Sequence, residues 1–542
     1  MARTHLLTFF QQLYRDFEEA ELSGKPLTAV QHARGTEHSR RDFLKISAGA
    51  TAAAVFAKPA GLLAATQPRI VIIGGGIAGL NAALTLQDAG YASTIYEASN
   101  RIGGRMHSDT TSWKNGQITE HCGELLDSTN KTILGLAKRF GIDIADLKAA
   151  EPLHSTPTFY FFGRYYLRDT ANDDFGPVYH AVQTDATAAG FPTTFDNFND
   201  AGFALDHLSL YDWIETRVPG GHGRPLGQLL DVASNTEFGA ETSIQSSLNL
   251  IYALAFQTIP GNFPTLRRSN ERYHLVGGSE QLPCAIRAIL PASSIQTGTS
   301  LTAITKNTDG TFTLGLKRGA SKFTVVADRV ILTLPFSVLR NLDYHAAGFN
   351  AVKTTAIQQL GYGTNAKLHL QFNERLWNKP GPWGISTGST FSDTGYQSTW
   401  DVTRAQPGAT GILVDYTGGN IGASFRDSGN PSIVNGYANQ FLSQIGPVFP
   451  SSSEEAGLGP EWNGRATLDT PARDPYLLGS YSFWKRGQYT SFAGAERQRS
   501  GNCHFAGEHC SIIFQAFMEG AAEEGARAAN EILSDYKAGV FP

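Results

Sequence analysis

Apolar positions near residue 70 follow the order expected of a strand, a helix and a second strand. Residues 69–73 form a short β-branched apolar run, which is typical of a buried parallel strand. Residues 80–89 carry helix-forming side chains with apolar positions at helical spacing, and Gly90 closes that segment. Residues 94–96 resume the strand pattern and end at Glu97. We therefore predict a β–α–β unit at this place in the chain.

The turn inside this unit is rich in glycine, since residues 74–79 match the pattern G-x-G-x-x-G. Gly74 permits the tight turn, Gly76 lets the backbone approach a pyrophosphate, and Gly79 lets the helix pack close to the strand. The helix N-terminus offers free N–H groups to phosphates, and Glu97 can accept hydrogen bonds from ribose hydroxyls. The order of these parts predicts a dinucleotide site rather than a plain glycine-rich turn. It does not separate FAD from NAD.

Two further segments favour FAD. Arg101 and Arg105 flank a glycine pair just after the second strand, and Arg105 can reach a pyrophosphate, although a basic surface turn would have the same sequence. Towards the other end of the chain, residues 505–509 predict a short strand and a turn leading to a helix near Met518. There Glu508 can bind ribityl hydroxyls, and the helix start can direct N–H groups at the flavin O2 and N1 atoms.

The first 66 residues predict an export segment. Residues 1–38 are polar and partly amphipathic, and Arg40 and Arg41 then precede Phe-Leu-Lys. Residues 46–65 are mildly apolar but contain a lysine and a proline, which makes a membrane-spanning helix a poor fit. The pattern is typical of a twin-arginine signal and predicts a periplasmic or secreted protein. The alternative is a surface arginine pair before a loose alanine-rich helix, and the weak cleavage signal leaves retention of the segment open.

Composition and charge exclude several classes of protein. The 542 residues are too many for one core and predict two intertwined domains. The net charge is −5 and no basic stripe occurs, so we expect no nucleic-acid partner. No C-x-x-C pair occurs, so we expect neither a metal site nor a disulfide framework, although Cys503 and Cys510 could meet in space. The cysteines are Cys122, Cys284, Cys503 and Cys510.

Taken together, these segments resemble the flavin amine oxidase family, which includes monoamine, polyamine and L-amino acid oxidases. The resemblance covers roughly residues 67–535 and looks closest to bacterial L-amino acid oxidases. Besides the glycine-rich turn and Glu97, it rests on residues 101–105, 330–335 and 505–529 and on Lys367.

The resemblance implies an α/β fold, in which a discontinuous Rossmann-type FAD-binding domain accompanies an α+β substrate domain. The implied segments are 1–66 for the leader, 67–130, 270–345 and 475–536 for the FAD-binding domain, and 131–269 and 346–474 for the substrate domain. Strand patterns agree with the FAD-binding segments and lie at residues 273–278, 300–304 and 325–334.

The resemblance also implies FAD as the cofactor. In the family, a residue at the position of Leu301 binds the adenine through its backbone. Some members bond FAD covalently through a cysteine just before a tyrosine of the substrate cage; that position is Ser480 here, so we predict non-covalent FAD. The expected cofactor-binding residues are Gly74, Gly76, Ala78, Gly79, Glu97, Ala98, Arg101, Gly104, Arg105, Leu301, Gly507, Glu508, Phe517 and Met518.

Five residues are expected to act on the substrate. The resemblance implies that Lys367 holds a water near flavin N5 and assists the reaction with oxygen, whereas burial statistics alone would make it an outward-facing lysine. It implies that Tyr481 and Phe517 form an aromatic cage, with Trp484 as a further wall. Tyr416 matches a tyrosine that contacts the substrate carboxylate. Without the resemblance, these rings would be ordinary core aromatics.

The resemblance implies oxidative deamination of L-amino acids. Flavin N5 accepts a hydride from the α-carbon, and the imine hydrolyses to a keto acid and ammonia. Molecular oxygen then reoxidises the flavin and yields hydrogen peroxide.

One position departs from the family pattern. The animal enzymes place an arginine for the carboxylate two residues beyond the G-G-R turn, and here that position is His107. Arg267, Arg268 and Arg272 are candidate replacements. Glu124 either contacts the substrate ammonium or caps a turn.

Rival functions therefore stay open. His107 favours an oxidase of simple primary amines or polyamines, whereas Tyr416 favours amino acids. A flavin amine dehydrogenase that avoids oxygen is a second rival, and a non-catalytic flavoprotein is a third. The sequence also leaves the oligomeric state open, a homodimer included. Aromatic walls would favour bulky apolar side chains, and an acidic wall would favour lysine or arginine as the substrate.

Overall fold

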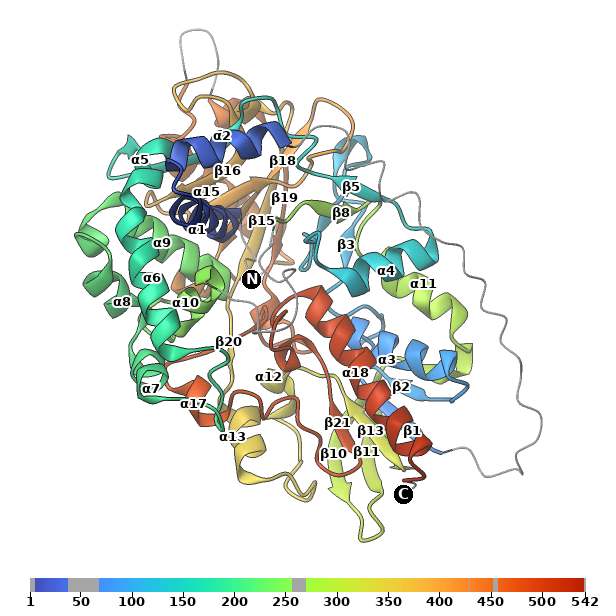
Figure 1. The fold of residues 1–542 in the computed structure, drawn as a ribbon. Coiled ribbons are helices and arrows are strands. Elements are labelled where there is room, and N and C mark those ends of the chain that lie inside the picture. Colours follow the sequence, from blue (N-terminus) through green and yellow to red (C-terminus); the bar gives the residue numbers. More distant parts are fainter. Residues whose placement is uncertain (1–4, 38–67, 256–269, 427, 452–456, 541–542) are drawn as a thin grey trace.

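Two large sheets organise the fold of the computed structural model (Figure 1), one of five strands and one of seven. The structure describes residues 5–37, 68–255, 270–426, 428–451 and 457–540. The predicted twin-arginine stretch, Arg267 and Arg268 lie outside these residues. No helix within the described ranges is both long and apolar enough to cross a membrane.

The first sheet is parallel throughout. Its strands in spatial order are β21 (Cys503–Phe505), β13 (Arg329–Leu332), β1 (Ile70–Ile73), β2 (Thr94–Tyr96) and β9 (Ile295–Gln296). Helix α3 (Ile77–Asp88) follows β1 directly and leads to β2, which confirms the predicted strand–turn–helix–strand unit. The Rossmann-type architecture expected from the sequence is therefore confirmed.

Alternate residues of β1 serve two different cores. Ile70 and Ile72 pack with α3 and with α18 (Met518–Lys537), which lies beside α3. Val71 and Ile73 pack on the opposite face. There a three-stranded sheet covers them, made of β10 (Thr299–Lys306), β11 (Phe312–Arg318) and β12 (Ser321–Ala327). Both faces are apolar because both are covered.

The apolar run at residues 325–334, which we predicted as one strand, is two strands. β12 ends at Ala327 and pairs antiparallel with β11, whereas β13 begins at Arg329 and pairs parallel with β1. Between them, Asp328 accepts a hydrogen bond of 2.7 Å from the backbone N–H of Arg69. The chain changes sheets at this point, and apolar periodicity alone does not mark such a change.

The second sheet is mixed, and only its β16–β6 pair is parallel among the described strands. Its order is β19 (Trp462–Asp469), β15 (Ala366–Phe372), β18 (Gly411–Thr417), β17 (Ser398–Asp401), β16 (Ser386–Ser392), β6 (Thr156–Phe161) and β7 (Arg164–Tyr165). Every residue of the four strands from β15 to β16 in this order is buried. Helix α15 (Pro431–Ile445) contributes to the core that includes Leu368 and Leu370.

A helical layer packs beside the second sheet and includes the first helix of the chain, α1 (His5–Ser23) (Figure 1). Leu7, Phe10, Leu13 and Tyr14 of α1 are at most 3% exposed. They pack against α6 (Gly176–Ala189), α9 (Pro225–Phe238) and α10 (Leu248–Ala255). The sequence predicts that these residues belong to the leader, but α1 is part of the core, because its apolar side chains lie at helical spacing.

Short elements join the two sheets. β14 (Gly361–Tyr362) pairs with β20 (Ser482–Phe483), which brings Tyr481 beside the start of β15. The other short strands are β3 (Ser108–Asp109), β4 (Thr119–Glu120), β5 (Ile144–Asp146) and β8 (Tyr273–Leu275). The other helices are α2 (Leu27–Glu37), α4 (Lys131–Phe140), α5 (Arg168–Asp174), α7 (Asp200–His207), α8 (Leu210–Arg217), α11 (Gln281–Ile289), α12 (Phe336–Leu339), α13 (Ala351–Gln359), α14 (Gly419–Ser424), α16 (Leu458–Glu461) and α17 (Gln488–Phe492).

Candidate active site

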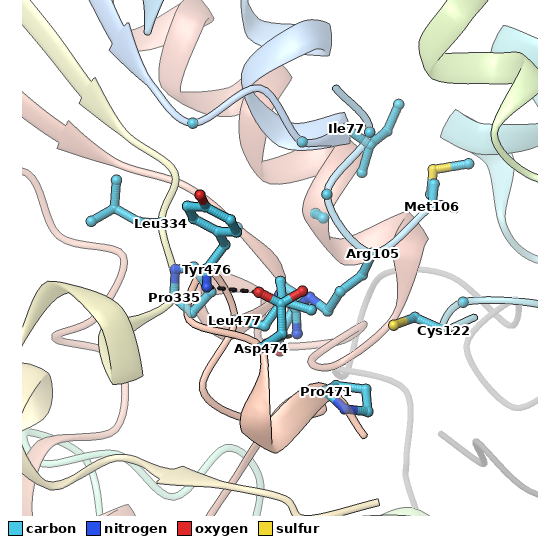
Figure 2. Close-up of a pocket in the computed structure, with 18 of the residues that line it drawn as sticks. Ile77, Arg105, Met106, Cys122, Leu334, Pro335, Pro471, Asp474, Tyr476 and Leu477 are labelled. Carbon is cyan, nitrogen blue, oxygen red and sulfur yellow. Dashed lines mark hydrogen bonds and ion pairs between the residues drawn. The ribbon is translucent and has the colours of Figure 1, made fainter. Parts of the chain in front are cut away.

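A cavity of about 840 Å³ runs from the glycine-rich turn after β1 to the middle of the second sheet. Figure 2 shows one part of it, with Ile77, Arg105 and Met106 on one side and Leu334 and Pro335 on the other. The cavity collects most of the predicted site residues, namely Gly74, Gly76, Ala78, Glu97, Ala98, Arg101, Gly104, Arg105, Leu301, Lys367, Tyr416, Tyr481, Gly507, Glu508, Phe517 and Met518. Gly79 and Trp484 are not among its lining residues.

The glycine-rich turn forms a backbone cradle at the start of α3. A Cβ atom on Gly104 would lie 3.2 Å from the Cα of Gly76, so two stretches of backbone meet where side chains would fill the space. Gly79 has a packing role, since a Cβ there would lie 2.0 Å from the carbonyl oxygen of Gly74. The open cradle and the free N–H groups of α3 fit the pyrophosphate of a dinucleotide.

Glu97 and Leu301 fit the adenosine end of such a ligand. The Glu97 carboxylate accepts hydrogen bonds from the backbone N–H groups of Gly75 (2.7 Å) and Ser99 (2.8 Å), which fixes it in the cavity wall. The Leu301 side chain is buried in the core between the five-stranded sheet and the three-stranded sheet. An irregularity in the β10–β11 pairing lies between Leu301 and Ala303. Leu301 therefore has only backbone polar atoms to offer to a ligand, as expected.

Arg105 and Glu508 form an ion pair in the wall. Arg105 Nη1 lies 3.0 Å from Glu508 Oε1 and donates to the Ser480 carbonyl at 2.8 Å. Burial opposes the charge of Arg105, but Glu508 outweighs it and raises the pKa of Arg105. Glu508 also accepts from Ser482 Oγ (2.7 Å) and from the Ala516 N–H (2.8 Å). The Glu508 carboxylate thus positions Arg105 and the loop before α18 in addition to facing the cavity.

Lys367 points inward from β15 and is 6% exposed, so the outward-facing alternative is wrong. Its Nζ donates to Glu124 Oε2 at 2.8 Å and to the Glu120 carbonyl at 3.1 Å. Glu124 Oε1 accepts from the indole N–H of Trp400 at 3.0 Å. Both carboxylate oxygens of Glu124 therefore have partners, and Glu124 also lines the cavity.

Two tyrosine hydroxyls meet at the same end of the cavity. The hydroxyl oxygens of Tyr416 on β18 and Tyr481 lie 2.7 Å apart, and the Tyr481 hydroxyl also donates to the Thr236 carbonyl at 3.1 Å. The Trp400 ring lies 4.9 Å from the Tyr416 ring. Phe517 lies directly before α18 and lines the same cavity. The residues form an aromatic enclosure suited to a small amine.

The structure does not place Trp484 in this enclosure. Its ring lies 5.0 Å from Tyr489 and 5.7 Å from Phe492, within a hydrophobic core. Trp400, which lines the cavity, is not among the residues that the sequence predicted for the site. The pairing of β17 with β18, which carries Tyr416, is the signal that leads to Trp400, and it is absent from local sequence.

Of the candidate cations for a carboxylate, Arg272 is the one that the structure describes, and it is engaged elsewhere. Arg272 lies 2.7 Å from Asp146 and does not line the cavity. The His107 ring packs 4.2 Å from His121, and only His121 of the two lines the cavity. Arg101 donates to the Gly104 carbonyl at 2.7 Å, near the glycine cradle. Among the described residues, the arginines of the cavity wall are Arg101 and Arg105, and both are bonded to other residues of that wall.

The cysteines are all free thiols, and Cys122 lines the cavity. Burial raises the pKa of Cys122 to about 12, so it stays a thiol. Ser480, which stands where some enzymes of this kind carry a cysteine, donates from Oγ to Asn365 at 2.7 Å. The described residues contain no group of three or more side chains arranged to hold a metal ion.

Three other proteins are similar to this chain over most of its length. An L-amino-acid oxidase of Siganus canaliculatus is 24% identical over 485 residues, which cover 86% of this chain and 85% of that protein. An L-amino acid dehydrogenase of Synechocystis sp. is 24% identical over 482 residues, covering 85% and 94%. The solved cyclohexylamine oxidase from Brevibacterium oxydans IH-35A has the same fold, with a TM-score of 0.71, 18% identity, and coverage of 87% of this chain and 100% of that one.

Two family models match the chain. Residues 37–57 match the signal sequence of the TAT (twin-arginine translocation) pathway, as predicted. Residues 77–533 match flavin containing amine oxidoreductase, and these residues include the cavity wall from Ile77 to Ala521. The chain therefore belongs to the flavin-containing amine oxidoreductase family, and FAD is its cofactor.

Proposed function

We propose that the enzyme is an L-amino acid oxidase, which forms an imino acid that hydrolyses to a keto acid and ammonia, with hydrogen peroxide as the second product. The observation that supports it most is the Tyr416–Tyr481 hydroxyl pair, 2.7 Å apart, which shares one cavity with Lys367. Bound FAD supplies the redox chemistry, accepting a hydride from the substrate α-carbon at N5.

The chain's own residues orient the substrate and exclude water. The rings of Tyr481 and Phe517 hold the neutral amine in line by shape, and the Trp400 ring closes the enclosure beside Tyr416. When substrate is bound, the Tyr416 hydroxyl turns its hydrogen from Tyr481 to a carboxylate oxygen of the substrate. The Lys367 ammonium, which lines the same cavity, positions a water and assists the reaction with oxygen. Trp484 has no role in this proposal.

The test is a substrate panel with purified holoenzyme in air. L-amino acids, D-amino acids and simple amines are supplied separately, and peroxide and ammonia are measured together. We expect both products from L-amino acids alone. Activity with simple amines only would contradict the proposal, and a bleached flavin spectrum without peroxide would indicate a dehydrogenase with another acceptor.

An oxidase of amines without a carboxylate is the second candidate, and one observation favours it. The described arginines of the cavity wall are bonded to the Gly104 carbonyl and to Glu508, whereas Glu124 and Glu271 add acidic groups to the same wall. The variant Tyr416→Phe separates the candidates. For an amino acid oxidase, KM should rise about tenfold or more, because a hydrogen bond to a charged group is lost. For an amine oxidase, KM should stay within about twofold.

Further features of the holoenzyme follow as proposals. FAD is bound non-covalently, because Ser480 stands at the position used for attachment; acid precipitation should release all of the flavin. The protein is exported and works in the periplasm or outside the cell, which fractionation of an expressing bacterium would test. The FAD-binding domain comprises residues 67–130, 270–345 and 475–536, and this is supported by the origin of all five parallel strands in those segments.

A further inference from the structure

Glu124 is the buried group that neither the cofactor nor the proposed reaction requires. Its side chain and that of Lys367 are each 7% exposed, and Glu124 Oε2 lies 2.8 Å from Lys367 Nζ. Its other oxygen accepts the Trp400 indole hydrogen bond at 3.0 Å. One carboxylate therefore engages both the lysine assigned to the oxygen reaction and a wall of the substrate enclosure.

We propose that Glu124 is a positioning residue for Lys367: its carboxylate holds the lysine ammonium and the Trp400 indole at the substrate end of the cavity and thereby sets the rate of the oxygen step. The inference rests on the proposed function, because it uses the role given there to Lys367. Glu124 acts through Lys367 and Trp400 and not on the reacting atoms.

The strand order shows how one side chain reaches both partners. β15, which carries Lys367, and β17, which carries Trp400, are the two neighbours of β18. Tyr416 on β18 pairs in register with Lys367 on β15 and, on its other side, with Ser398 on β17. Glu124 lies in the loop after β4 and is hydrogen-bonded to Lys367 on β15 and to Trp400 on β17. Its carboxylate therefore links the two strands that flank Tyr416.

The charges agree with this arrangement. Burial alone would raise the pKa of Glu124, but the Lys367 ammonium and, less strongly, His274 outweigh it, and the pKa of Glu124 lies below its ordinary value. A buried ammonium needs such a counter-charge, because removing one partner of a buried pair leaves the other charge uncompensated. The other ionisable groups around the pair are Glu120, Cys122, Glu271, His274, His369, Tyr416 and Asp469.

The first test is a thermal double-mutant cycle on the holoenzyme with Glu124→Gln, Lys367→Met and the two combined. Each single change should lower Tm by several degrees, because a buried charge loses its partner. The combined variant should recover most of that loss, because no buried charge remains. Losses that simply add would overturn the pairing on which the inference depends.

The second test measures the oxygen step directly. Enzyme reduced with dithionite is mixed with oxygen, so that the rate is obtained whatever the substrate is. Glu124→Gln should slow reoxidation about as much as Lys367→Met, tenfold or more, and the combined variant should be no slower than Lys367→Met.

Glu524→Gln is the matched control. Glu524 is buried and lies 2.9 Å from Arg497 and 2.7 Å from Arg527, and it does not line the cavity. It should lower Tm but leave reoxidation unchanged. If oxygen reoxidises the Glu124→Gln variant as fast as the wild type, the inference is overturned. If the wild type itself reacts slowly with oxygen, the oxidase function fails and the oxygen part of the inference fails with it. If oxygen reacts fast but amino acids are not oxidised, the proposed function alone fails.

Discussion

Glu271 makes the stability of this protein depend on pH in a way that can be measured. Its side chain is 2% exposed in the cavity wall. Burial raises the pKa of Glu271 from 4.5 to about 8, and the nearby Arg404 and Lys148 oppose this only in part. The folded state therefore holds the proton more tightly than the unfolded state. Stability falls as pH rises above about 4.5, and the loss is complete above about 8.

Replacing Glu271 with glutamine removes the charge while keeping the shape. The gap of about 3.5 pH units, at ~1.4 kcal/mol for each, makes the buried charge cost about 5 kcal/mol above pH 8. An unfolding entropy of about 2.1 cal/mol/K per residue gives ~1.1 kcal/mol/K for a chain of 542 residues. We therefore expect Glu271→Gln to raise Tm by about 4 °C at pH 8.5 and by less than about 1 °C at pH 5.

The assay is thermal unfolding of variant and wild type side by side at the two pH values. Glu19→Gln, on an exposed position of α1, is the control and should give the same small difference at both. Equal Tm values for Glu271→Gln and the wild type at pH 8.5, or an equal gain at both pH values, would refute the reasoning, because neither result is compatible with a carboxyl that ionises at a cost in the folded state.

Three further changes test other parts of the fold. Gly79→Ala places a methyl group 2.0 Å from the Gly74 carbonyl oxygen, so the turn must shift. The variant should lose more than half of its bound FAD, measured as flavin absorbance per chain. Trp400→Phe should raise KM several-fold while Trp484→Phe lowers Tm and leaves KM unchanged; the reverse pattern would restore Trp484 to the site. Phe10→Ala should lower the free energy of unfolding by about 3–5 kcal/mol in denaturant titrations, and a change below about 1 kcal/mol would mean that α1 is not docked.

The sequence predicts those parts of this protein well whose structure is determined by residues close together in the chain. The β1–turn–α3 unit is local, and Gly79 lies within it because the helix must touch the turn that precedes it. Sequence also predicted that the second strand ends at Glu97 and that a helix begins near Met518, since both follow from local strand and helix signals.

The parts that local sequence patterns do not predict depend on pairing between distant segments. Lys367 lies on a strand that is buried on both faces. Alternation of apolar and polar residues therefore does not distinguish buried from exposed positions there, and only the resemblance placed Lys367 at the site. Nothing in the local sequence distinguishes Trp400 from Trp484 as a site residue. The strand order of the second sheet brings Trp400 beside Tyr416. The split at Asp328 is of the same kind, because two sheets divide one apolar run.

The docking of α1 has a consequence for the processing of the protein. The residues that match the twin-arginine signal, 37–57, follow α1 and α2 and precede β1, so the signal is tethered to folded protein at both ends. A peptidase cut after it would sever α1 from the rest of the chain without removing its packing against α6, α9 and α10. The product would be a complex of two chains held by an interface, and its melting temperature would then depend on its own concentration.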